Sequence, residues 1–398
     1  MQLKEKLADV QKQLQKQKID GWLFYDFRRS NEIACRFLDI SSDQFLTRRF
    51  FYWIPKKGSP VKIVHGIESH VLSHLPGNTL TYRSWQELET NLQNTLKGCK
   101  HAAMEYSPYN ALPYLSKVDA GTVDLIRKFG VQVVTSATLL QYYTSIWSDF
   151  QLQSHLAATD VLCRTVDQAW TFIAQHLKSN ISITEYAVQQ FILQKFEQQN
   201  CVMAGTPICA VNEHSALPHY CAEKKESAAI KIGDFILIDL WCKQDLPDAV
   251  YADITRVGVA APRPTNRQQE IFEIVKRARD AATVFVENQL SQGAAIKGCE
   301  VDQVCRQVIT EAGYGDYFTH RTGHNIDQED HGNGTHIDSL ETQDERLLLP
   351  RTCFSIEPGI YLPDEFGVRL EYDLFIHSNG KVQITGGIQQ EITCLDLS

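Results

Sequence analysis

Acidic side chains interrupt segments in the second half of the chain that otherwise favour burial. Asp239 closes the apolar run 235–238, and a carboxylate on a buried strand is costly unless it is paired or bound to a cation. Comparable apolar or glycine-rich surroundings are shared by five residues: Asp239, Asp253, His324, Glu357 and Glu371. Any one of them could be hydrogen-bonded or ion-paired to a neighbour, but five such groups buried together would repel one another without a cation. Four carboxylates and one imidazole form a hard, oxygen-rich ligand set that suits Mn²⁺, Co²⁺, Fe²⁺ or Zn²⁺.

The apolar pattern predicts the strands that carry these residues. Residues 233–240 are expected as a buried strand, and 251–259 as its hairpin partner. A hairpin brings Asp239 and Asp253 close on one face, so that two carboxylates can share one pair of ions. Two further strands are expected to carry Glu357 and Glu371, at residues 353–361 and 368–376.

The length predicts two domains, because 398 residues exceed the roughly 250–300 at which one hydrophobic core stops growing. The expected domains are residues 1–148 and 149–398. The first alternates between helix and strand and is expected to be a smaller α/β domain, in which we recognise no chemical constellation. Its expected elements are a helix at 3–18 and strands at 21–25, 49–55, 61–64, 102–105 and 131–134.

The second domain is expected to be α+β, because long helical patterns frame its strands. These helices are expected at residues 151–178, 184–199, 267–290 and 301–312. Ser182 is the expected N-cap of the second of these helices, with Glu185 at the capping-box position.

Composition and charge exclude several classes of function. The formal net charge of −9 and the lack of basic runs make nonspecific binding to nucleic acid or to an anionic membrane unfavourable. No apolar run approaches the roughly 18–20 residues that cross a bilayer, and the first twenty residues are polar. Eleven cysteines without a CxxC pair indicate reduced thiols rather than a disulfide framework. We therefore expect a cytoplasmic protein.

Histidines gather in the same part of the chain as the acidic set. Six of the 13 histidines fall between residues 214 and 336, which favours a shared function for some of them. His320 lies four residues before His324, His331 follows seven residues after it, and His219 stands in a Pro-His-Tyr sequence. The neighbours of the other two, His214 and His336, indicate exposed loops, and we expect no functional role for this pair.

Four phrases of the sequence together resemble the ordered signature of the pita-bread (M24-type) metallopeptidases. The phrases are LIDLW…VYADITRV, HRTGHNIDQEDHG, FSIEPGIY and GVRLEYD, and the resemblance spans residues 150–395. Methionine aminopeptidase, prolidase and aminopeptidase P belong to this family. The N-terminal domain resembles the creatinase/prolidase module that methionine aminopeptidases lack, which places the chain nearer to prolidase and aminopeptidase P. The resemblance implies a C-terminal pita-bread fold.

The resemblance also implies a dinuclear metal site and the role of each ligand. Asp239 resembles the bidentate ligand of one metal, and His324 and Glu357 resemble ligands of the other. Asp253 and Glu371 resemble the carboxylates that bridge both ions. Manganese is the expected metal, with cobalt, zinc or iron as alternatives. Glu357 is also the expected general base or proton shuttle.

Further residues are carried over as substrate contacts. His219 and His331 match the histidines that contact the scissile peptide, and His320 resembles a supporting histidine of the pocket. Arg369 resembles an arginine that orients a metal-bound carboxylate, although a plain ion pair with the acidic cluster would use the same residue.

One departure concerns the separation of the first two ligands. Asp239 and Asp253 stand 14 residues apart (253 − 239), whereas the family pattern is usually shorter. We expect a longer hairpin tip that leaves the two positions facing each other, and the alternative is a change of register that displaces Asp253. Trp241 stands where the family commonly has a small residue.

The resemblance implies cleavage of the bond before proline, that is, the activity of an Xaa-Pro dipeptidase or of an Xaa-Pro aminopeptidase. The residues do not decide between the two, and Arg346 and Arg351 are candidates for binding the carboxylate of a dipeptide. A metal-independent creatinase-like hydrolase and a noncatalytic peptide-binding module are the alternatives. By analogy we also expect a homodimer.

Overall fold

The computed structural model describes residues 3–398 and divides into two compact units, Met1–Thr144 and Ser145–Ser398. The expected boundary after residue 148 lies slightly further along the chain. The difference arises from Trp147, whose indole is buried in a cluster with Val250 and Phe375 of the second unit. Its backbone N–H also donates to the carbonyl of Arg351, at 2.8 Å. These contacts place Trp147 within the second unit.

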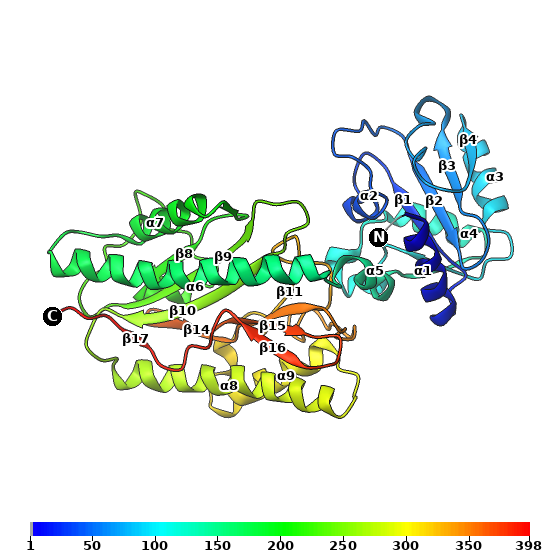
Figure 1. Ribbon diagram of the computed structural model, residues 1–398. Helices are drawn as coiled ribbons and strands as arrows, with labels where there is room; N and C mark the ends of the chain where they lie inside the picture. The colour runs from blue at the N-terminus through cyan, green and yellow to red at the C-terminus, as the bar shows by residue number, and fades with distance from the viewer. Residues whose placement is uncertain (1–2) are drawn as a thin grey trace. The chain divides into compact units, whose positions relative to one another are not determined.

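The first unit is built on one six-stranded mixed sheet (Figure 1). In spatial order its strands are β4 (Asn78–Tyr82), β3 (Val61–His65), β2 (Phe50–Pro55), β1 (Gly21–Asp26), β5 (His101–Met104) and β6 (Gln132–Thr135). The helices are α1 (Leu3–Lys16), α2 (Glu32–Phe37), α3 (Trp85–Thr95), α4 (Ala120–Lys128) and α5 (Ala137–Thr144).

All five strands expected in this unit are confirmed, and the strand that the prediction missed is β4. Its sequence, NTLTY, is polar and mostly exposed, so it carries no burial signal. The central strand β1 is buried on both faces because successive side chains alternate. Trp22 and Phe24 enter one apolar cluster, and Leu23 and Tyr25 enter the other.

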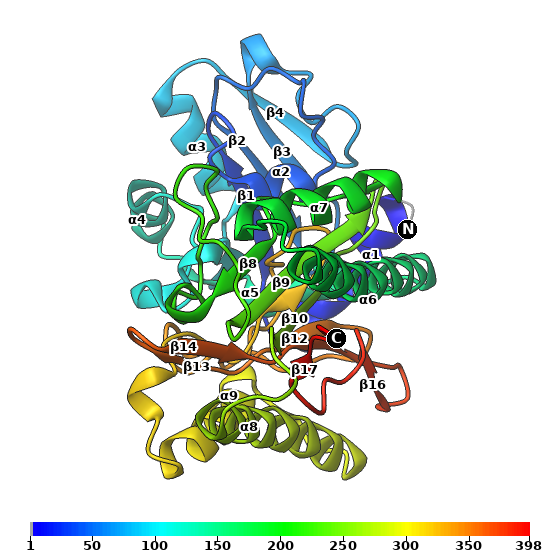
Figure 2. The same ribbon diagram turned by 90° about the vertical axis from the view of Figure 1, so that its left-hand side faces the viewer.

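The second unit places strands between two pairs of helices. Helices α6 (Asp149–Lys178) and α7 (Glu185–Gln198) cover one side, and α8 (Asn266–Ser291) and α9 (Gly298–Glu311) cover the other (Figures 1 and 2). Apolar side chains of α6 and α7 share a cluster with Ile236 and Ile254, and those of α8 and α9 share another with Phe235, Val257 and the C-terminal strands. The four expected helices are confirmed to within a few residues.

The strands of this unit form three sheets. The first contains β7 (Cys201–Val202), β8 (Ile208–Val211), β9 (Phe235–Gln244), β10 (Ala252–Val259) and β17 (Thr393–Cys394). The second contains β11 (Asn325–Ile326), β12 (Cys353–Ile356), β15 (Tyr372–Ile376) and β16 (Val382–Thr385). The third is a two-stranded ribbon of β13 (Gly359–Leu362) and β14 (Phe366–Arg369).

The two C-terminal strands expected from the sequence are each broken into two. The strand expected at 353–361 stops at Ile356 and resumes at Gly359, on either side of Glu357-Pro358. The strand expected at 368–376 is interrupted at Leu370-Glu371. Proline has no N–H to donate to a ladder, so the break at Pro358 follows from its chemistry. Glu357 therefore lies where the chain leaves the second sheet for the ribbon, and Glu371 lies where it returns from the ribbon to that sheet.

The start of α7 differs from the prediction. Thr184, rather than Ser182, is the N-cap, and its hydroxyl accepts from the N–H of Ala187 at 3.2 Å. Glu185 does not form a capping box. Its buried carboxylate instead accepts hydrogen bonds from one segment at four points: Val211 N (2.8 Å), His214 Nδ1 (2.9 Å), Tyr220 Oη (2.7 Å) and Ala228 N (2.7 Å). This carboxylate fixes the loop that carries His219.

Within the described part of the chain, no helix has the length and apolar character needed to cross a membrane. Each of the eleven cysteines carries a free thiol.

Candidate metal centre

The hairpin of β9 and β10 places the first two predicted ligands on one face. Asp239 is paired with Thr255, and Asp253 is paired with Trp241. Residues opposite each other in an antiparallel pair, and residues two apart on one strand, share a face. Asp239 and Asp253 are therefore diagonal neighbours on one face of the hairpin. They do not stand opposite each other as expected, because each is paired with a residue two positions away from the other. The longer loop, residues 245–251, leaves the register of β10 intact.

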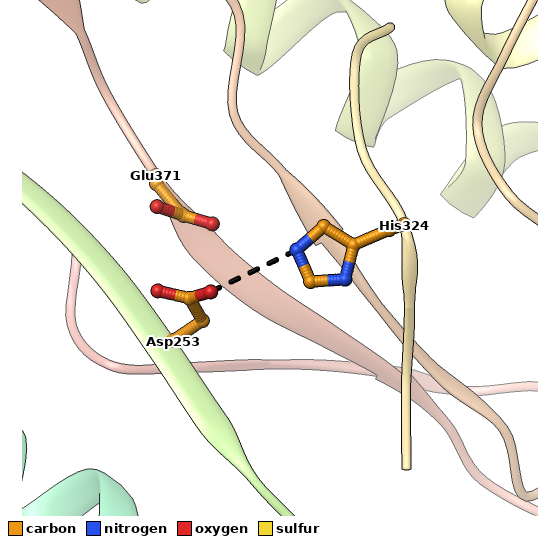
Figure 3. Close-up of side chains that lie close together, drawn as sticks. All are labelled: Asp253, His324 and Glu371. Carbon is orange, nitrogen blue, oxygen red and sulfur yellow. Dashed lines mark ion pairs between the residues drawn. The ribbon is translucent and has the colours of Figure 1, made fainter. Parts of the chain in front are cut away.

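Three of the predicted ligands converge from distant parts of the sequence. Asp253 comes from β10, His324 precedes β11, and Glu371 lies at the break before β15, as Figure 3 shows. Each offers one ligand atom, and these atoms lie within 4.8 Å of one another. Nε2 of His324 is 3.7 Å from Oδ2 of Asp253. All three side chains are buried.

Glu357 adjoins this group from the break that follows β12. Its Oε1 is 3.4 Å from Nε2 of His324 and accepts a hydrogen bond from Oγ of Ser355 at 3.0 Å. Ser355 Oγ also accepts from the backbone N–H of His324 at 3.0 Å, so one hydroxyl positions both residues. The two chains can approach closely because residue 323 is glycine: a Cβ there would lie 1.9 Å from the carbonyl oxygen of Ser355.

Asp239 lies in the same cavity but is turned toward a guanidinium. Its Oδ2 accepts from Arg369 at 2.5 Å, and its Oδ1 accepts from Thr255 Oγ1 at 3.1 Å. Thr255 Oγ1 shares its single hydrogen with Oε2 of Glu371, at the shorter distance of 2.6 Å, and so lies between the two carboxylates. Arg369 further donates to Thr255 Oγ1 (2.9 Å) and to the hydroxyl of Tyr361 (3.1 Å). Arg369 thus orients Asp239, and not the neighbouring Glu371.

Burial and repulsion between like charges shift the pKa values of Asp253, Glu371, Glu357 and His324 in the directions that favour their uncharged forms. Burial raises the pKa of Asp253 well above its ordinary range, and the charges of Glu371 and Asp239 raise it further. Burial likewise raises the pKa of Glu371, with Glu357 and Asp239 adding to the effect. The pKa of Glu357 is raised to about 7, mainly by burial. Burial lowers the pKa of His324 well below its usual value. Such a group of acids needs protons or a cation to offset its charge.

Two buried oxygen atoms indicate the cation. Among the described residues, Oδ1 of Asp253 and Oε1 of Glu371 have no hydrogen-bond partner. An unpartnered buried carboxylate oxygen is costly, and a metal ion would satisfy it. The donor set, four carboxylates and a neutral imidazole, fits a hard or borderline divalent ion.

The acidic cluster forms the floor of a cavity of about 420 Å³, and the predicted substrate histidines line it. His219 and His331 are exposed, and the ring of His331 lies 4.2 Å from that of His324. His320 is half-buried and bonded to the hydroxyl of Tyr361 at 2.6 Å. Trp241 also lines the cavity. All the predicted site residues therefore surround one space, although only Asp253, His324 and Glu371 form the close group.

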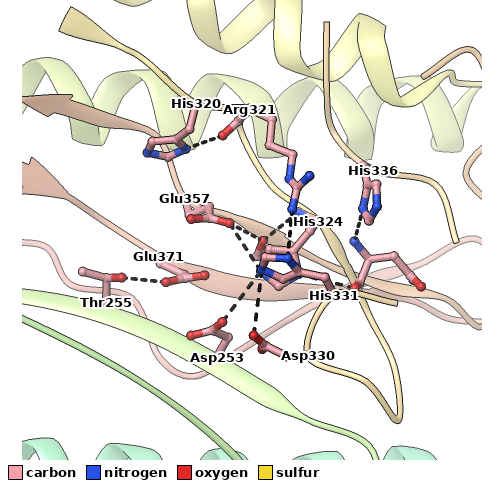
Figure 4. Close-up of polar contacts among 12 residues, drawn as sticks. Asp253, Thr255, His320, Arg321, His324, Asp330, His331, His336, Glu357 and Glu371 are labelled. Carbon is pink, nitrogen blue, oxygen red and sulfur yellow. Dashed lines mark hydrogen bonds and ion pairs between the residues drawn. The ribbon is translucent and has the colours of Figure 1, made fainter. Parts of the chain in front are cut away.

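Sequence reasoning missed several polar residues of this cavity (Figure 4). Arg321 and Asp330 line it, and Arg321 lies 3.3 Å from Nδ1 of His331. Burial and the charges of Asp239 and Glu357 raise the pKa of Asp330 to about 7. Asp373 accepts from the backbone N–H of Asp253 at 2.9 Å and fixes that strand. Arg321 and Asp330 adjoin the predicted His320 and His331 in the sequence, and Asp373 lies two residues after Glu371, so sequence proximity was the signal that could have identified them.

Other expectations are corrected. Arg346 is buried and bonded to Asp344, and Arg351 donates to the carbonyl of Trp147 and to Asp149, so neither lines the cavity. His336 is not in an exposed loop: it is buried, and its Nδ1 accepts from the N–H of Asn325 at 3.0 Å. His214 is half-buried against Glu185.

Comparison with known proteins finds a family model that matches part of the second unit, and relatives that match part of the chain. Residues 158–378 match the model of metallopeptidase family M24. The chain is 37% identical over 223 residues to a protein from Pyrococcus horikoshii named Xaa-Pro dipeptidase, an alignment that covers 56% of this chain and 58% of that protein.

Solved structures resemble the whole chain. A dipeptidase from Pyrococcus horikoshii superposes with a TM-score of 0.65 at 23% identity, covering 99% of this chain and 100% of that one. The X-prolyl aminopeptidase of Caenorhabditis elegans, described as a cytosolic enzyme with a di-nuclear active site, gives a TM-score of 0.62 at 16% identity, covering 97% and 62%. These likenesses confirm the expected pita-bread fold with its smaller N-terminal α/β domain.

Proposed function

The chain belongs to metallopeptidase family M24, and on this basis we propose that it hydrolyses the peptide bond between an N-terminal residue and proline. The observation that carries the proposal is the group of Asp253, His324 and Glu371, with two unpartnered carboxylate oxygens, at the floor of a cavity lined by histidines. The relatives named Xaa-Pro dipeptidase support the substrate.

Five residues would hold two divalent ions: Asp239, Asp253, His324, Glu357 and Glu371. We propose manganese as the metal, with cobalt, zinc or iron as alternatives. When bound, such ions supply a water of lowered pKa and stabilise negative charge on a carbonyl oxygen. Asp253 and Glu371 are the proposed bridging ligands, because both belong to the close group and each has a buried oxygen without a hydrogen-bond partner.

The protein's own side chains carry the remaining steps. Glu357 is the proposed proton acceptor, since it lies in the cavity wall with its side chain 14% exposed, where a water can reach it. His219 and His331 are proposed to donate hydrogen bonds to the peptide and to the oxygen that becomes charged. Arg369 is a positioning residue: it holds Asp239 in place and is itself held by Tyr361.

This arrangement suits a substrate in which proline follows the bond to be cleaved. The nitrogen of an Xaa-Pro bond carries no hydrogen and the ring fixes φ, so a site that reads backbone N–H groups handles it poorly. Recognition of the carbonyl and of the ring face avoids that requirement. Trp241 and His331 provide flat faces in the cavity wall against which a pyrrolidine ring can pack.

Arg321 is the proposed contact for the carboxylate of a dipeptide. It lines the cavity beside His331, and no carboxylate of residues 6–398 forms an ion pair with its guanidinium. Arginine binds a carboxylate through two parallel hydrogen bonds. This choice replaces Arg346 and Arg351, whose guanidiniums are engaged elsewhere, and it favours dipeptidase over aminopeptidase activity.

The decisive experiment measures hydrolysis of Ala-Pro by the full chain, before and after chelation and after addition of Mn²⁺ or Co²⁺. We expect activity only with metal, and much lower activity on Ala-Ala. Activity that survives exhaustive chelation would favour the creatinase-like alternative, and no turnover of any Xaa-Pro peptide would favour a binding module. The cytoplasmic location and the homodimer stay predictions, which cell fractionation and sedimentation would test.

A further inference from the structure

A second cavity, of about 540 Å³, lies at one edge of the sheet in the first unit. Four separate segments line it, each at the end of a strand: residues 27–28 after β1, 47–49 before β2, 65 at the end of β3, and 82–85 at the end of β4. Because β1 and β3 are both antiparallel to β2, and β4 is parallel to β3, these ends meet at a single edge. Ligands of open α/β sheets bind beyond the carboxyl ends of the strands.

Arginine dominates this cavity, although the chain as a whole carries a net charge of −9. The lining includes four arginines, Arg28, Arg48, Arg49 and Arg83, and no acidic residue. Among the side chains of residues 6–398, no carboxylate forms an ion pair with any of the four guanidiniums. Like charges gathered around one space repel one another unless an anion lies between them.

Two carboxylates that contact this part of the chain are already engaged with its backbone. Glu68 is buried and accepts from the N–H of Thr47 at 3.0 Å and of Arg48 at 3.1 Å. Glu87 accepts from the N–H of Arg83 at 2.6 Å and, in the capping box of α3, from the N–H of Ser84 at 3.4 Å. Both acids therefore shape the rim of the cavity and leave the guanidiniums without counter-ions.

Neutral side chains complete a binding site of mixed character. Nδ1 of His65 accepts from the N–H of Ile67 at 3.2 Å, so in the neutral ring the proton lies on Nε2, which is then a donor. The indole of Trp85 is 61% exposed and the ring of Phe27 is 39% exposed, which leaves two apolar faces beside the charged groups. An exposed tryptophan beside arginines suits a planar ligand group.

The turn that presents Arg28 is fixed in place. Arg28 and Arg29 both have positive φ, at 57° and 61°, a conformation that costs a non-glycine residue about 1 kcal/mol. Buried Asp26 holds the turn by accepting from the N–H of Arg29 at 3.0 Å and of Asn31 at 2.9 Å. Arg29 in turn donates to the carbonyl of Gln44 at 2.5 Å, which ties this turn to the segment before Thr47.

We propose that this arginine cavity binds a phosphorylated ligand with at least two negative charges, such as pyrophosphate or a nucleoside diphosphate. Guanidinium groups match phosphate oxygens bidentately. One carboxylate offers two oxygens and one charge, whereas a diphosphate offers oxygens in several directions and enough charge for four guanidiniums. The volume falls in the roughly 300–1,000 Å³ range of small-ligand sites. This site is independent of the proposed peptidase function.

The test is calorimetric titration of the full chain with pyrophosphate and with ADP, with and without chelator, so that capture by the metal centre is distinguished. We expect saturable binding that persists with chelator. The double variant Arg48→Gln/Arg83→Gln should weaken it at least about tenfold, the equivalent of one lost charge-assisted hydrogen bond. The matched control is Arg127→Gln, an exposed arginine of the same unit outside the cavity lining, which should change it less than about twofold.

The remaining arms separate the sources of the phosphate group. If ADP binds more tightly than pyrophosphate and Trp85→Ala removes the gain, the ligand is a nucleotide; equal affinities indicate the phosphate groups alone. Thermal unfolding of each variant confirms that the fold is kept. Absence of saturable binding of both probes, equal weakening in Arg127→Gln, or preference for citrate over pyrophosphate would overturn the proposal.

Discussion

Replacing Glu357 by glutamine should make the metal-free protein less sensitive to rising pH. In the native state the pKa of Glu357 is about 7, against an ordinary value of 4.5, mainly because the side chain is buried. The native state therefore holds a proton that the unfolded chain releases between pH 4.5 and 7, and stability falls as the pH rises through that window. Each pKa unit is worth about 1.4 kcal/mol, so the loss from this residue is about 3 kcal/mol.

The assay is urea unfolding of the chelated full chain at pH 5 and pH 8. The transition of the second unit is identified as the one that Mn²⁺ displaces. Wild type should lose about 3 kcal/mol more than Glu357→Gln between the two values, and somewhat more than this because the charge of Glu357 also raises the pKa of Glu371. Glu223→Gln, at an exposed glutamate, is the matched control and should follow wild type.

The reasoning would be refuted if wild type and Glu357→Gln lost equal stability over this range. That result would mean that Glu357 ionises in the native metal-free state as readily as in the unfolded chain. It would remove Glu357 from the charge-repelling cluster, and with it one of the arguments for a cation beside this residue.

Three further predictions concern activity with Mn²⁺. Asp253→Asn should reduce Ala-Pro turnover by more than the roughly 100-fold typical of residues that only support a ligand, while thermal unfolding of the chelated protein is not lowered; near wild-type turnover would place the bridging site elsewhere. Arg369→Lys keeps the charge but loses the two-pronged guanidinium that holds Asp239 and Thr255, so kcat should fall about 10- to 100-fold. An unchanged kcat would mean that Arg369 only neutralises charge and does not position Asp239. Arg321→Gln should raise KM for Ala-Pro about tenfold, as expected for a charge-assisted hydrogen bond, and leave KM for Ala-Pro amide unchanged; equal effects on both would exclude carboxylate binding.

The sequence predicted what depends on local pattern. Buried strands and long amphipathic helices follow from periodicity, and five acid or imidazole residues in apolar or glycine-rich segments together suggested a cation. The breaks at Glu357 and Glu371 were not predicted, because the apolar pattern of the sequence does not change where the chain passes from one sheet to another. Only the tertiary fold decides that Arg369 contacts Asp239 rather than Glu371.

Residues held together by topology were the least predictable. The arginine cavity of the first unit combines side chains up to 58 residues apart (85 − 27), so no sequence motif indicates it. Similarly, Glu185 resembled an ordinary capping residue, and its true partners lie 26–43 positions further along the chain.

The four hydrogen bonds that Glu185 accepts have a consequence for how a peptide is received. They anchor the loop bearing His219 at both ends before any substrate arrives, and Ser215 of the same loop is fastened to Gly367 by a further hydrogen bond of 2.8 Å. One wall of the cleft is thus rigid while its imidazole stays open to solvent. Binding of a short peptide then does not have to order this loop. The entropic cost of ordering a mobile loop is avoided, which favours a higher affinity.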